Sequence, residues 1–399
     1  MTASPQPQRP LASTPSTSVR EGGRYAFFTN ECVGLGHLRR TMTLAGAVHA
    51  IDPTGTSLIV TGSAALMDQS PPAGVEILKL PAVGRDAQGR YESRTLAMTL
   101  DGALAMRADL ARVAVTGFAP HVVVVDKLPL GLGHELLPAL TALRRRGGCR
   151  IVLGLRDIED DPDVVRARWR HLRPVLRRFY DGVLVYGPES GRDALACMQW
   201  ADLDLPVEHV GYVGAELPAA GSSPSDLPDD YLLVANGGGL DGFELSSAVV
   251  AAVRHAALPL PVVLVTGPLM PADHHAEIVR LAGGLDISVH RSRSDMAAVV
   301  VGARAVVTMA GYNAVSEALR AGKPTLLVPR TGPSSEQLIR AVTLSDSGAA
   351  LMLHEDELAP GTLRPALDRL LARRRPMLVS GEYDGAARAA SALTSIEQG

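Results

Sequence analysis

The stretch VVTMAGYNAVSEALRAGKPTLLVPRTGPSSEQLIRA, residues 306–341, contains two strands and two helix starts in alternation. An apolar β-branched run ends at Met309, and Gly311 then permits a tight turn. A helical pattern begins near Asn313 and places Glu317 one turn inside the helix. GKP ends that helix and opens the next strand, and SSEQ opens another helix. This order is typical of a parallel sheet with helices on its faces.

The same alternation runs through most of the chain. Continuous apolar runs, which are typical of buried parallel strands, are RYAFF (24–28), SLIVTG (57–62), VEILKL (75–80), HVVVVDK (121–127), RIVLGL (150–155), GVLVYG (182–187), YLLVANG (231–237), PVVLVTG (261–267), ARAVVTM (303–309) and KPTLLVP (323–329). Between the halves lies ELPAAGSSPSDLPDD, residues 216–230, whose Pro, Ser and Asp content predicts a linker. We therefore predict an α/β protein with two tandem Rossmann-like domains, 24–215 and 231–399, that face each other across a cleft. Residues 1–23 are rich in Pro, Ser, Thr and Gln and predict a disordered tail.

Composition limits the classes of partner. The 399 residues are 46% hydrophobic and carry a formal net charge of −3, which gives no basis for a nucleic-acid partner. Cys32, Cys149 and Cys197 lie far apart, which argues against a zinc site or a disulfide framework. No apolar run approaches the ~18 residues that span a bilayer, and the first residues lack the apolar core of a secretory signal. We expect a cytoplasmic protein without a transmembrane segment, while peripheral contact with a membrane stays open.

A second informative stretch, NECVGLGHLRRTMTLAGAVHA (30–50), joins the first strand to a helix. Gly34 and Gly36 let the chain turn tightly and approach a ligand. His37 stands near the helix N-terminus, where unpaired N–H groups favour an anion or a developing negative charge. Taken alone, the pattern fits a helix-capping turn with an incidental histidine equally well.

Two familiar nucleotide motifs do not fit these loops. Arg39 stands where the third glycine of the dinucleotide motif G-x-G-x-x-G belongs, and no strand ends in an acidic residue at the expected distance. NGGGLDG, residues 236–242, follows a strand but lacks the Gly-Lys-Ser/Thr of a nucleotide hydrolase. Two interpretations of this loop remain: it binds a nucleotide diphosphate through its backbone N–H groups, or it is a plain strand-to-helix turn.

Five segments together resemble glycosyltransferases of the two-domain GT-B fold, in particular family 28 (the MurG-like type) and its bacterial branch of predicted glycosyltransferases. They are GLGHLRR (34–40), VDKLPLGLGHELLPAL (125–140), LGLRDIEDDP (153–162), VANGGGLDG (234–242) and AGYNAVSEALRAGKPTLLVPR…EQLIRA (310–341). The resemblance implies an inverting transferase that moves a sugar from a nucleotide-diphosphate sugar, a UDP-sugar in particular, to an acceptor hydroxyl or amine. It implies neither a metal nor a cofactor beyond that co-substrate.

The resemblance also implies roles for individual residues. His37 is the candidate general base, and Asp126 is the next candidate. Glu317 matches the acid that binds the ribose hydroxyls, and the pair Glu336 and Gln337 matches the residues that read the donor sugar. The remaining donor-binding candidates are Gly34, Gly36, Gly237, Gly238, Gly239, Gly311 and Asn313 around the diphosphate, and Arg291 near the base or phosphate.

The chain departs from the family pattern in two places. The family has Asp-Gln or Gln-Gln where this chain has Glu336 and Gln337, which leaves the donor sugar undefined. The first glycine loop is shorter than in the peptidoglycan enzyme of the family, so a lipid acceptor does not carry over. Three classes of acceptor remain possible from the sequence: a small metabolite, a glycan and a lipid-linked molecule.

Several polar residues at predicted strand ends could either bind a ligand or stabilise their own loop. Lys127, His134 and Glu135 follow the strand that ends at Asp126 and fit either acceptor binding or capping of their own loop. Arg156 and Asp157 end another strand, where an ion pair that fixes the loop is favoured.

Two other functions fit the same predicted fold. One is a non-hydrolysing sugar-nucleotide epimerase, which would need several acidic and histidine side chains around the sugar. The other is a catalytically silent protein that binds a sugar nucleotide.

Overall fold

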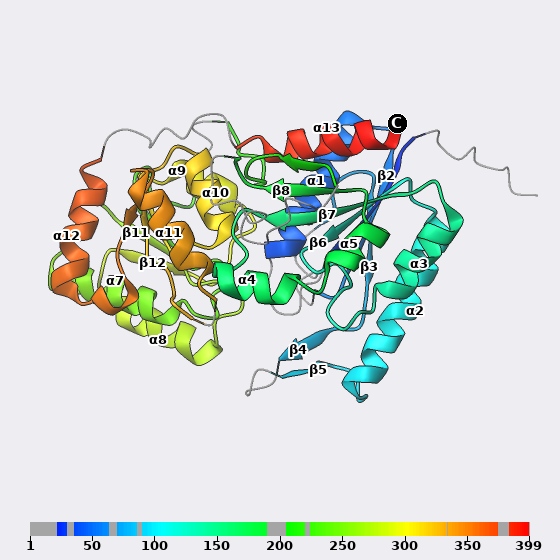
Figure 1. Ribbon diagram of the computed structural model, residues 1–399. Helices are drawn as coiled ribbons and strands as arrows, with labels where there is room; N and C mark the ends of the chain where they lie inside the picture. Colours follow the sequence, from blue (N-terminus) through cyan, green and yellow to red (C-terminus); the bar gives the residue numbers. More distant parts are fainter. Residues whose placement is uncertain are drawn as a thin grey trace, which may run out of the picture.

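The computed structural model describes residues 22–29, 36–63, 70–85, 90–189, 205–219, 224–332, 334–373 and 383–398. Two α/β domains, each built on a parallel sheet, lie side by side (Figure 1). The predicted fold class is therefore confirmed. Residues 1–21 of the predicted disordered tail lie outside the described residues, as do Gly34, Cys32 and Cys197.

Seven parallel strands form the sheet of the first domain in the described part of the chain, in the order β3-β2-β1-β6-β7-β8-β9. They are β1 (Arg24–Thr29), β2 (Thr56–Thr61), β3 (Val75–Lys79), β6 (Val122–Asp126), β7 (Arg150–Arg156), β8 (Gly182–Tyr186) and β9 (Val207–His209). A small antiparallel hairpin, β4 (Val83–Arg85) and β5 (Tyr91–Ser93), lies outside this sheet. The apolar runs named above account for every strand of the sheet except β9.

Helices cover both faces of the first sheet because alternate residues of its strands are apolar on each side. Phe27 and Val124 pack toward α1 (Gly36–Ile51) and α13 (Gly385–Gln398). Phe28 and Val125 pack toward the helices of the opposite face. Those helices are α2 (Leu100–Phe118), α3 (Leu137–Arg146), α4 (Pro162–Trp169) and α5 (Arg173–Phe179).

The second domain repeats this arrangement with strand order β12-β11-β10-β13-β14-β15. Its strands are β10 (Leu232–Ala235), β11 (Val262–Val265), β12 (Ile287–His290), β13 (Ala305–Thr308), β14 (Thr325–Leu327) and β15 (Leu351–Met352). One face packs on α7 (Phe243–His255), α8 (Ala272–Ala282) and α12 (Pro360–Leu371), and the other on α9 (Met296–Gly302) and α10 (Tyr312–Arg320). The remaining elements are α11 (Glu336–Asp346) and the short helix η2 (Glu355–Glu357).

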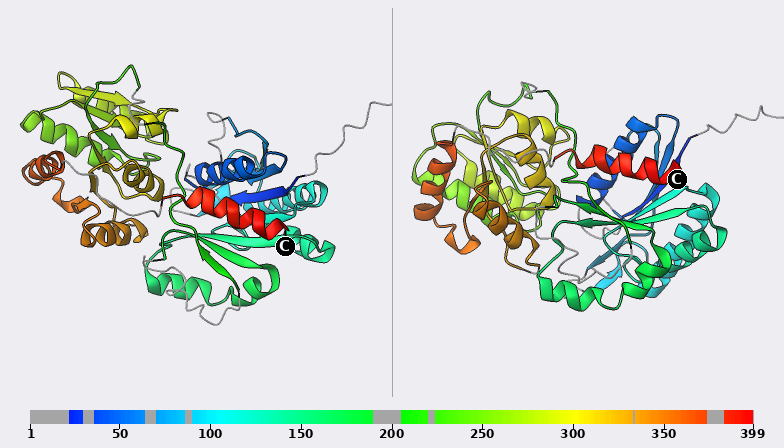
Figure 2. Two further views of the ribbon diagram at one scale, coloured as in Figure 1. Left: turned by 90° about the horizontal axis from the view of Figure 1, so that it is seen from above. Right: turned by 45° about the horizontal axis from the view of Figure 1, so that its top comes forward.

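The last helix corrects the predicted division of the chain. We expected residues 231–399 to form the second domain, but α13 packs along α1 of the first domain (Figure 2). Ala389 and Leu393 are fully buried there, in one cluster with Tyr25 and Phe27. The repeated small and apolar residues of α13 need an apolar partner, and the open face of β1 and α1 provides it.

An aromatic cluster joins the two domains close to the predicted boundary at residue 215. Tyr212 lies 5.8 Å from Tyr312 of α10 and 5.5 Å from Tyr383 at the start of the last helix, measured between ring centroids. The Tyr312 hydroxyl donates to the backbone oxygen of Tyr186 at 2.9 Å. The hydrophobic core is therefore continuous from one domain to the other.

Candidate functional site

A histidine and a carboxylate meet where two neighbouring strands of the first sheet end. His37 is the second residue of α1, and Asp126 is the last residue of β6. Nδ1 of His37 is hydrogen-bonded to Oδ2 of Asp126. Arg40, one turn along α1, donates to Oδ1 of Asp126 at 2.7 Å. Nη2 of Arg40 also lies 2.9 Å from Nδ1 of His37. Because a carboxylate only accepts, the contact with Asp126 requires the hydrogen on Nδ1, and Nε2 is then the nitrogen of His37 that can accept a proton.

Burial and charge set the protonation of this cluster. Burial lowers the pKa of His37 below its ordinary value, although Asp126 opposes that shift. Burial alone would raise the pKa of Asp126, but Arg40 and His37 hold it well below its usual range. At neutral pH the cluster therefore contains a carboxylate, a guanidinium and a neutral imidazole. The Arg40 guanidinium also lies over the ring of Tyr186, 5.1 Å from its centroid.

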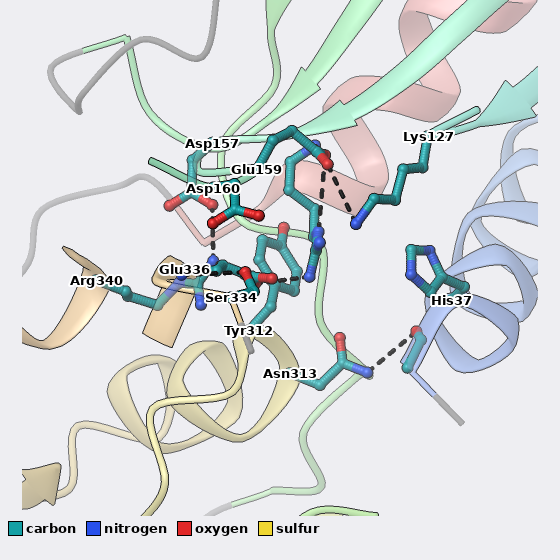
Figure 3. Close-up of polar contacts among 12 residues, drawn as sticks. His37, Lys127, Asp157, Glu159, Asp160, Tyr312, Asn313, Ser334, Glu336 and Arg340 are labelled. Atoms are coloured by element: carbon teal, nitrogen blue, oxygen red, sulfur yellow. Dashed lines mark hydrogen bonds and ion pairs between the residues drawn. The ribbon is translucent and has the colours of Figure 1, made fainter. Parts of the chain in front are cut away.

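The start of α10 in the second domain lies against this cluster. Nδ2 of Asn313 donates to the backbone oxygen of Gly36 at 3.1 Å, which joins the first turns of α10 and α1 (Figure 3). No side chain caps the N-terminus of α10 at Gly311. Helix starts without such a cap present backbone N–H groups to an anion.

The turn before α10 differs in detail from the predicted one. We expected Gly311 to provide the tight turn, but its φ is −65° and the left-handed residue is the buried Ala310, with φ of 59°. A Cβ at Gly311 would meet open space within 4 Å. Gly311 therefore leaves room beside the helix N-terminus rather than making the turn.

The second glycine loop, Gly237 to Gly239, connects β10 to α7 and lies against the loop after β11. A Cβ at Gly239, whose φ is 93°, would lie 2.4 Å from the backbone oxygen of Thr266. Leu269 donates its N–H to the backbone oxygen of Gly238 at 2.9 Å. Only glycine fits at Gly239, because both the φ angle and the close approach exclude a side chain.

Each of the two carboxylates expected to read donor hydroxyls is paired with an arginine of the first domain. Oε1 of Glu317 accepts from Nη2 of Arg39 at 2.9 Å. Oε1 of Glu336 accepts from Nη1 of Arg156 at 2.6 Å and from Nη2 of Arg340 at 3.0 Å. The junction of the domains is thus held by long-range ion pairs between opposite charges.

The two carboxylates differ in their acidity. Burial raises the pKa of Glu317, with Arg39 acting against it. Burial would also raise the pKa of Glu336, but Arg156 and Arg340 together lower it to about 2. Glu336 is therefore an anion at all physiological pH values.

Two predicted donor-binding residues have backbone partners in the structure. Oε1 of Gln337 accepts from the N–H of Arg330 at 3.2 Å. Nη2 of Arg291 donates to the backbone oxygen of Met270 at 2.6 Å. The structure thus brings together Gly36, His37, Asp126, Asn313, Glu317 and Glu336, whereas Gln337 and Arg291 support loops of the second domain.

The open alternatives at the strand ends are partly resolved by the contacts. Glu135 is buried, pairs with Arg107 at 3.0 Å and accepts the N–H of Gly133 at 2.8 Å, which favours the loop-capping interpretation. Lys127, with φ of 66°, pairs with Glu159 at 3.3 Å. The ion pairs expected at Arg156 and Asp157 exist, but not between these two residues, because Asp157 pairs with Arg340 at 3.3 Å.

Sequence reasoning missed three side chains of this site, Arg39, Arg40 and Arg340. Arg40 could have been found, since a residue three positions after His37 lies on the same face of a helix. Arg340 stands four positions after Glu336 and follows the same rule. Arg39 gave no such signal, because its partner is 278 residues away.

The described residues contain neither a cluster of metal ligands nor a membrane-spanning helix. No three His, Cys, Asp or Glu side chains in these ranges gather in a way that could hold a metal ion. None of the helices in the described part of the chain is long and apolar enough to cross a membrane.

Comparison with known proteins agrees with this geometry. Residues 233–384 match the model of the glycosyltransferase family 28 C-terminal domain. This stretch of the second domain is therefore similar to the C-terminal domain of glycosyltransferase family 28. The family 28 domain contains the glycine loop at 237–239, the start of α10, and both Glu317 and Glu336. The predicted resemblance to family 28 is therefore confirmed.

Curated relatives match over part of their length. The UDP-N-acetylglucosamine--N-acetylmuramyl-(pentapeptide) pyrophosphoryl-undecaprenol N-acetylglucosamine transferase of Exiguobacterium sp. is 30% identical over 173 residues, which are 43% of this chain and 47% of the relative. The enzyme of the same name from Agrobacterium fabrum is 29% identical over 170 residues, or 42% of this chain and 44% of the relative. The chain spans about half the length of the curated relatives it matches.

Solved structures extend the similarity to the whole fold. Acinetobacter baumannii MurG has a TM-score of 0.55 at 16% identity and covers 92% of this chain and 95% of its own. The calicheamicin glycosyltransferase CalG4 has a TM-score of 0.57 at 20% identity, and the match covers 94% of this chain and 95% of CalG4. A putative UDP-N-acetylglucosamine 2-epimerase from Listeria monocytogenes has a TM-score of 0.61 at 12% identity, covering 94% and 95%. These neighbours identify the fold as GT-B.

Proposed function

We propose that the chain is an inverting glycosyltransferase that moves a sugar from a nucleotide-diphosphate sugar, specifically a UDP-sugar, to an acceptor hydroxyl or amine. The pair of His37 and Asp126 carries the proposal, because it places an oriented base in the first domain opposite the start of α10 in the family 28 domain. The curated relatives, whose names specify UDP-N-acetylglucosamine as donor, support the donor class. A cytoplasmic location is part of the same proposal.

The reaction would be a single in-line displacement at the anomeric carbon. Nε2 of His37 takes the proton of the acceptor as its oxygen or nitrogen bonds to that carbon, and the bond to the diphosphate oxygen breaks on the opposite face. Asp126 stabilises the imidazolium that forms. Backbone N–H groups at the start of α10 and in the glycine loop at 237–239 receive the charge of the leaving diphosphate.

A panel of UDP-, dTDP- and GDP-sugars scored by thermal shift tests the donor class. A ligand at 100 times its Kd stabilises a protein by ~2.7 kcal/mol, so a true donor gives a clear shift. Release of the nucleoside diphosphate, measured with and without candidate acceptors, then tests transfer. Stabilisation by none of the three nucleotide classes would contradict the proposal.

The likeness to the epimerase structure makes epimerisation the second candidate. An epimerase would need no acceptor. It would change the configuration of the sugar in UDP-N-acetylglucosamine, and the product would still be a sugar nucleotide. A transferase releases UDP instead. Proton NMR of the donor incubated with the protein separates these outcomes, and binding without any product would identify a silent binding protein.

A further inference from the structure

Arg39 is a cation that extends from the first domain to the second. It lies on α1, and its Nη2 donates to Oε1 of Glu317 on α10 at 2.9 Å. The Arg39 side chain retains 31% of its surface exposed, whereas that of Glu317 retains 5%. Arg39 is therefore the partner that can move, and Glu317 is fixed within the second domain.

Arg39 occupies the place that the proposed function assigns to the donor ribose. Only 5% of the Glu317 side chain is exposed and Arg39 lies against it, so ribose hydroxyls that donate to Glu317 need the space that the guanidinium occupies. Binding of a nucleotide then displaces Arg39. A displaced cation needs a new anionic partner, since an unpaired charge at a partly buried junction is costly.

The start of α10 is the nearest place where a bound donor carries negative charge. The contact between Asn313 and Gly36 joins the first turns of α10 and α1. Arg39 lies three residues after Gly36, about one turn or roughly 5 Å along the helix axis. Side chains of a helix lean toward its N-terminus, so the long side chain of Arg39 can turn back along α1 toward the start of α10. A guanidinium binds phosphate oxygens in a bidentate manner, so its geometry suits this position.

We propose that Arg39 is a donor-binding residue that exchanges Glu317 for the donor's diphosphate when the ribose binds. The inference rests on the proposed function, because it takes Glu317 as the ribose ligand. The exchange leaves Arg39 paired with an anion both before and after binding. Through Arg39, the first domain would also contribute to donor affinity, although the proposed donor site belongs to the second domain.

The test compares UDP with uridine, which offers the ribose without the diphosphate. Both are titrated by calorimetry at pH 8 against the wild-type chain, Arg39→Gln and Arg39→Lys. Arg280→Gln is the matched control, because Arg280 also pairs with a carboxylate, Glu277, but on the exposed surface of α8. We expect Arg39→Gln to weaken UDP binding about tenfold or more, with Arg39→Lys intermediate. Uridine binding should stay unchanged or become tighter, because nothing competes for Glu317.

Other outcomes overturn the inference in distinguishable ways. Equal tightening of UDP and uridine by Arg39→Gln would mean that Arg39 only blocks the ribose position. Unchanged binding of both, or equal weakening of both, would mean that Arg39 does not contact the diphosphate. If the wild-type chain binds neither UDP nor uridine, the proposed UDP-sugar donor fails and the exchange fails with it.

Discussion

Arg156 donates from Nη1 to Oε1 of Glu336 at 2.6 Å, and this bond joins the end of β7 in the first domain to the first residue of α11 in the second. A residue of one domain thus orients the carboxylate that, by the proposed function, reads the donor sugar in the other. Figure 3 shows Glu336 beside Arg340 and opposite His37 and Lys127 of the first domain.

Arg156→Gln should therefore weaken binding of the sugar part of the donor. Arg156 acts on the sugar only through the orientation of Glu336. We therefore expect roughly tenfold weaker binding of the UDP-sugar, about 1.4 kcal/mol, and unchanged binding of UDP. Calorimetry with both ligands measures the difference. Arg166→Gln on the exposed face of α4 is the control. Equal affinity of the variant and the wild-type chain for the UDP-sugar would contradict this role.

His37→Ala should lower kcat with little change in donor affinity. A general base contributes roughly 10²–10⁴-fold to turnover, so we expect a loss of at least about a hundredfold in steady-state transfer assays. His255→Ala, at the exposed end of α7, is the matched control. Near-normal kcat with a much raised donor KM would instead make His37 a phosphate ligand.

Asp126→Asn should shift the acidic limb of the kcat–pH profile to lower pH and should lower kcat. Burial lowers the pKa of His37, and the charge of Asp126 partly offsets this. The neutral, active form of His37 is therefore lost as the pH falls through a value below 6.5. Removing the charge of Asp126 lowers that value further, so the acidic limb of kcat should shift to lower pH while kcat falls about tenfold or more. A pH–rate series measures both, with Asp109→Asn on exposed α2 as control. A shift to higher pH would contradict the assigned roles.

Glu317→Gln should weaken UDP and uridine binding alike. By the proposed function, the carboxylate accepts hydrogen bonds from two ribose hydroxyls, and loss of its charge corresponds to ~1.5–3 kcal/mol of binding free energy. Burial raises the pKa of Glu317 and so penalises the carboxylate but not the neutral amide, whereas loss of the pair with Arg39 acts in the opposite direction. The melting temperature should therefore change by no more than a few degrees. Glu277→Gln on the exposed face of α8 is the matched control. Unchanged UDP affinity in a folded variant would remove Glu317 from the donor site.

Transfer activity should persist in excess EDTA. By the proposed function, the start of α10 and the glycine loop at 237–239 offer backbone N–H groups to the leaving diphosphate. The two Asp-x-Asp triplets of the sequence, 161–163 and 202–204, belong to neither segment. Activity assays with EDTA, followed by addition of Mn²⁺ or Mg²⁺, check this. Complete loss of activity on chelation, restored by either ion, would contradict it.

The sequence predicts the two sheets well because their strands are buried on both faces. Runs such as HVVVVDK and PVVLVTG are apolar without alternation, and each coincides with a central strand, β6 or β11. Short edge strands such as β9 and β15 lack this signal. They form because a neighbouring strand offers unpaired backbone groups, which local sequence does not record.

The pairing of side chains within the site is predictable only where the partners are close in sequence. His37 and Gly36 follow from a local motif, and the start of α10 does so as well. The pairs of Arg39 with Glu317 and Arg156 with Glu336 depend on how two domains meet, and 278 and 180 residues separate their members. Gln337 points to the backbone of Arg330 because the turn before α11 places an N–H within its reach.

The position of α13 has a consequence for the order of assembly. The core beneath α1 is closed by Ala389 and Leu393, which the ribosome adds after the entire second domain. The first domain therefore stays uncovered on that face while the family 28 domain is being synthesised and can already fold. Native packing of the first domain is thus completed by residues that follow the second domain in the chain, which couples the folding of the two domains.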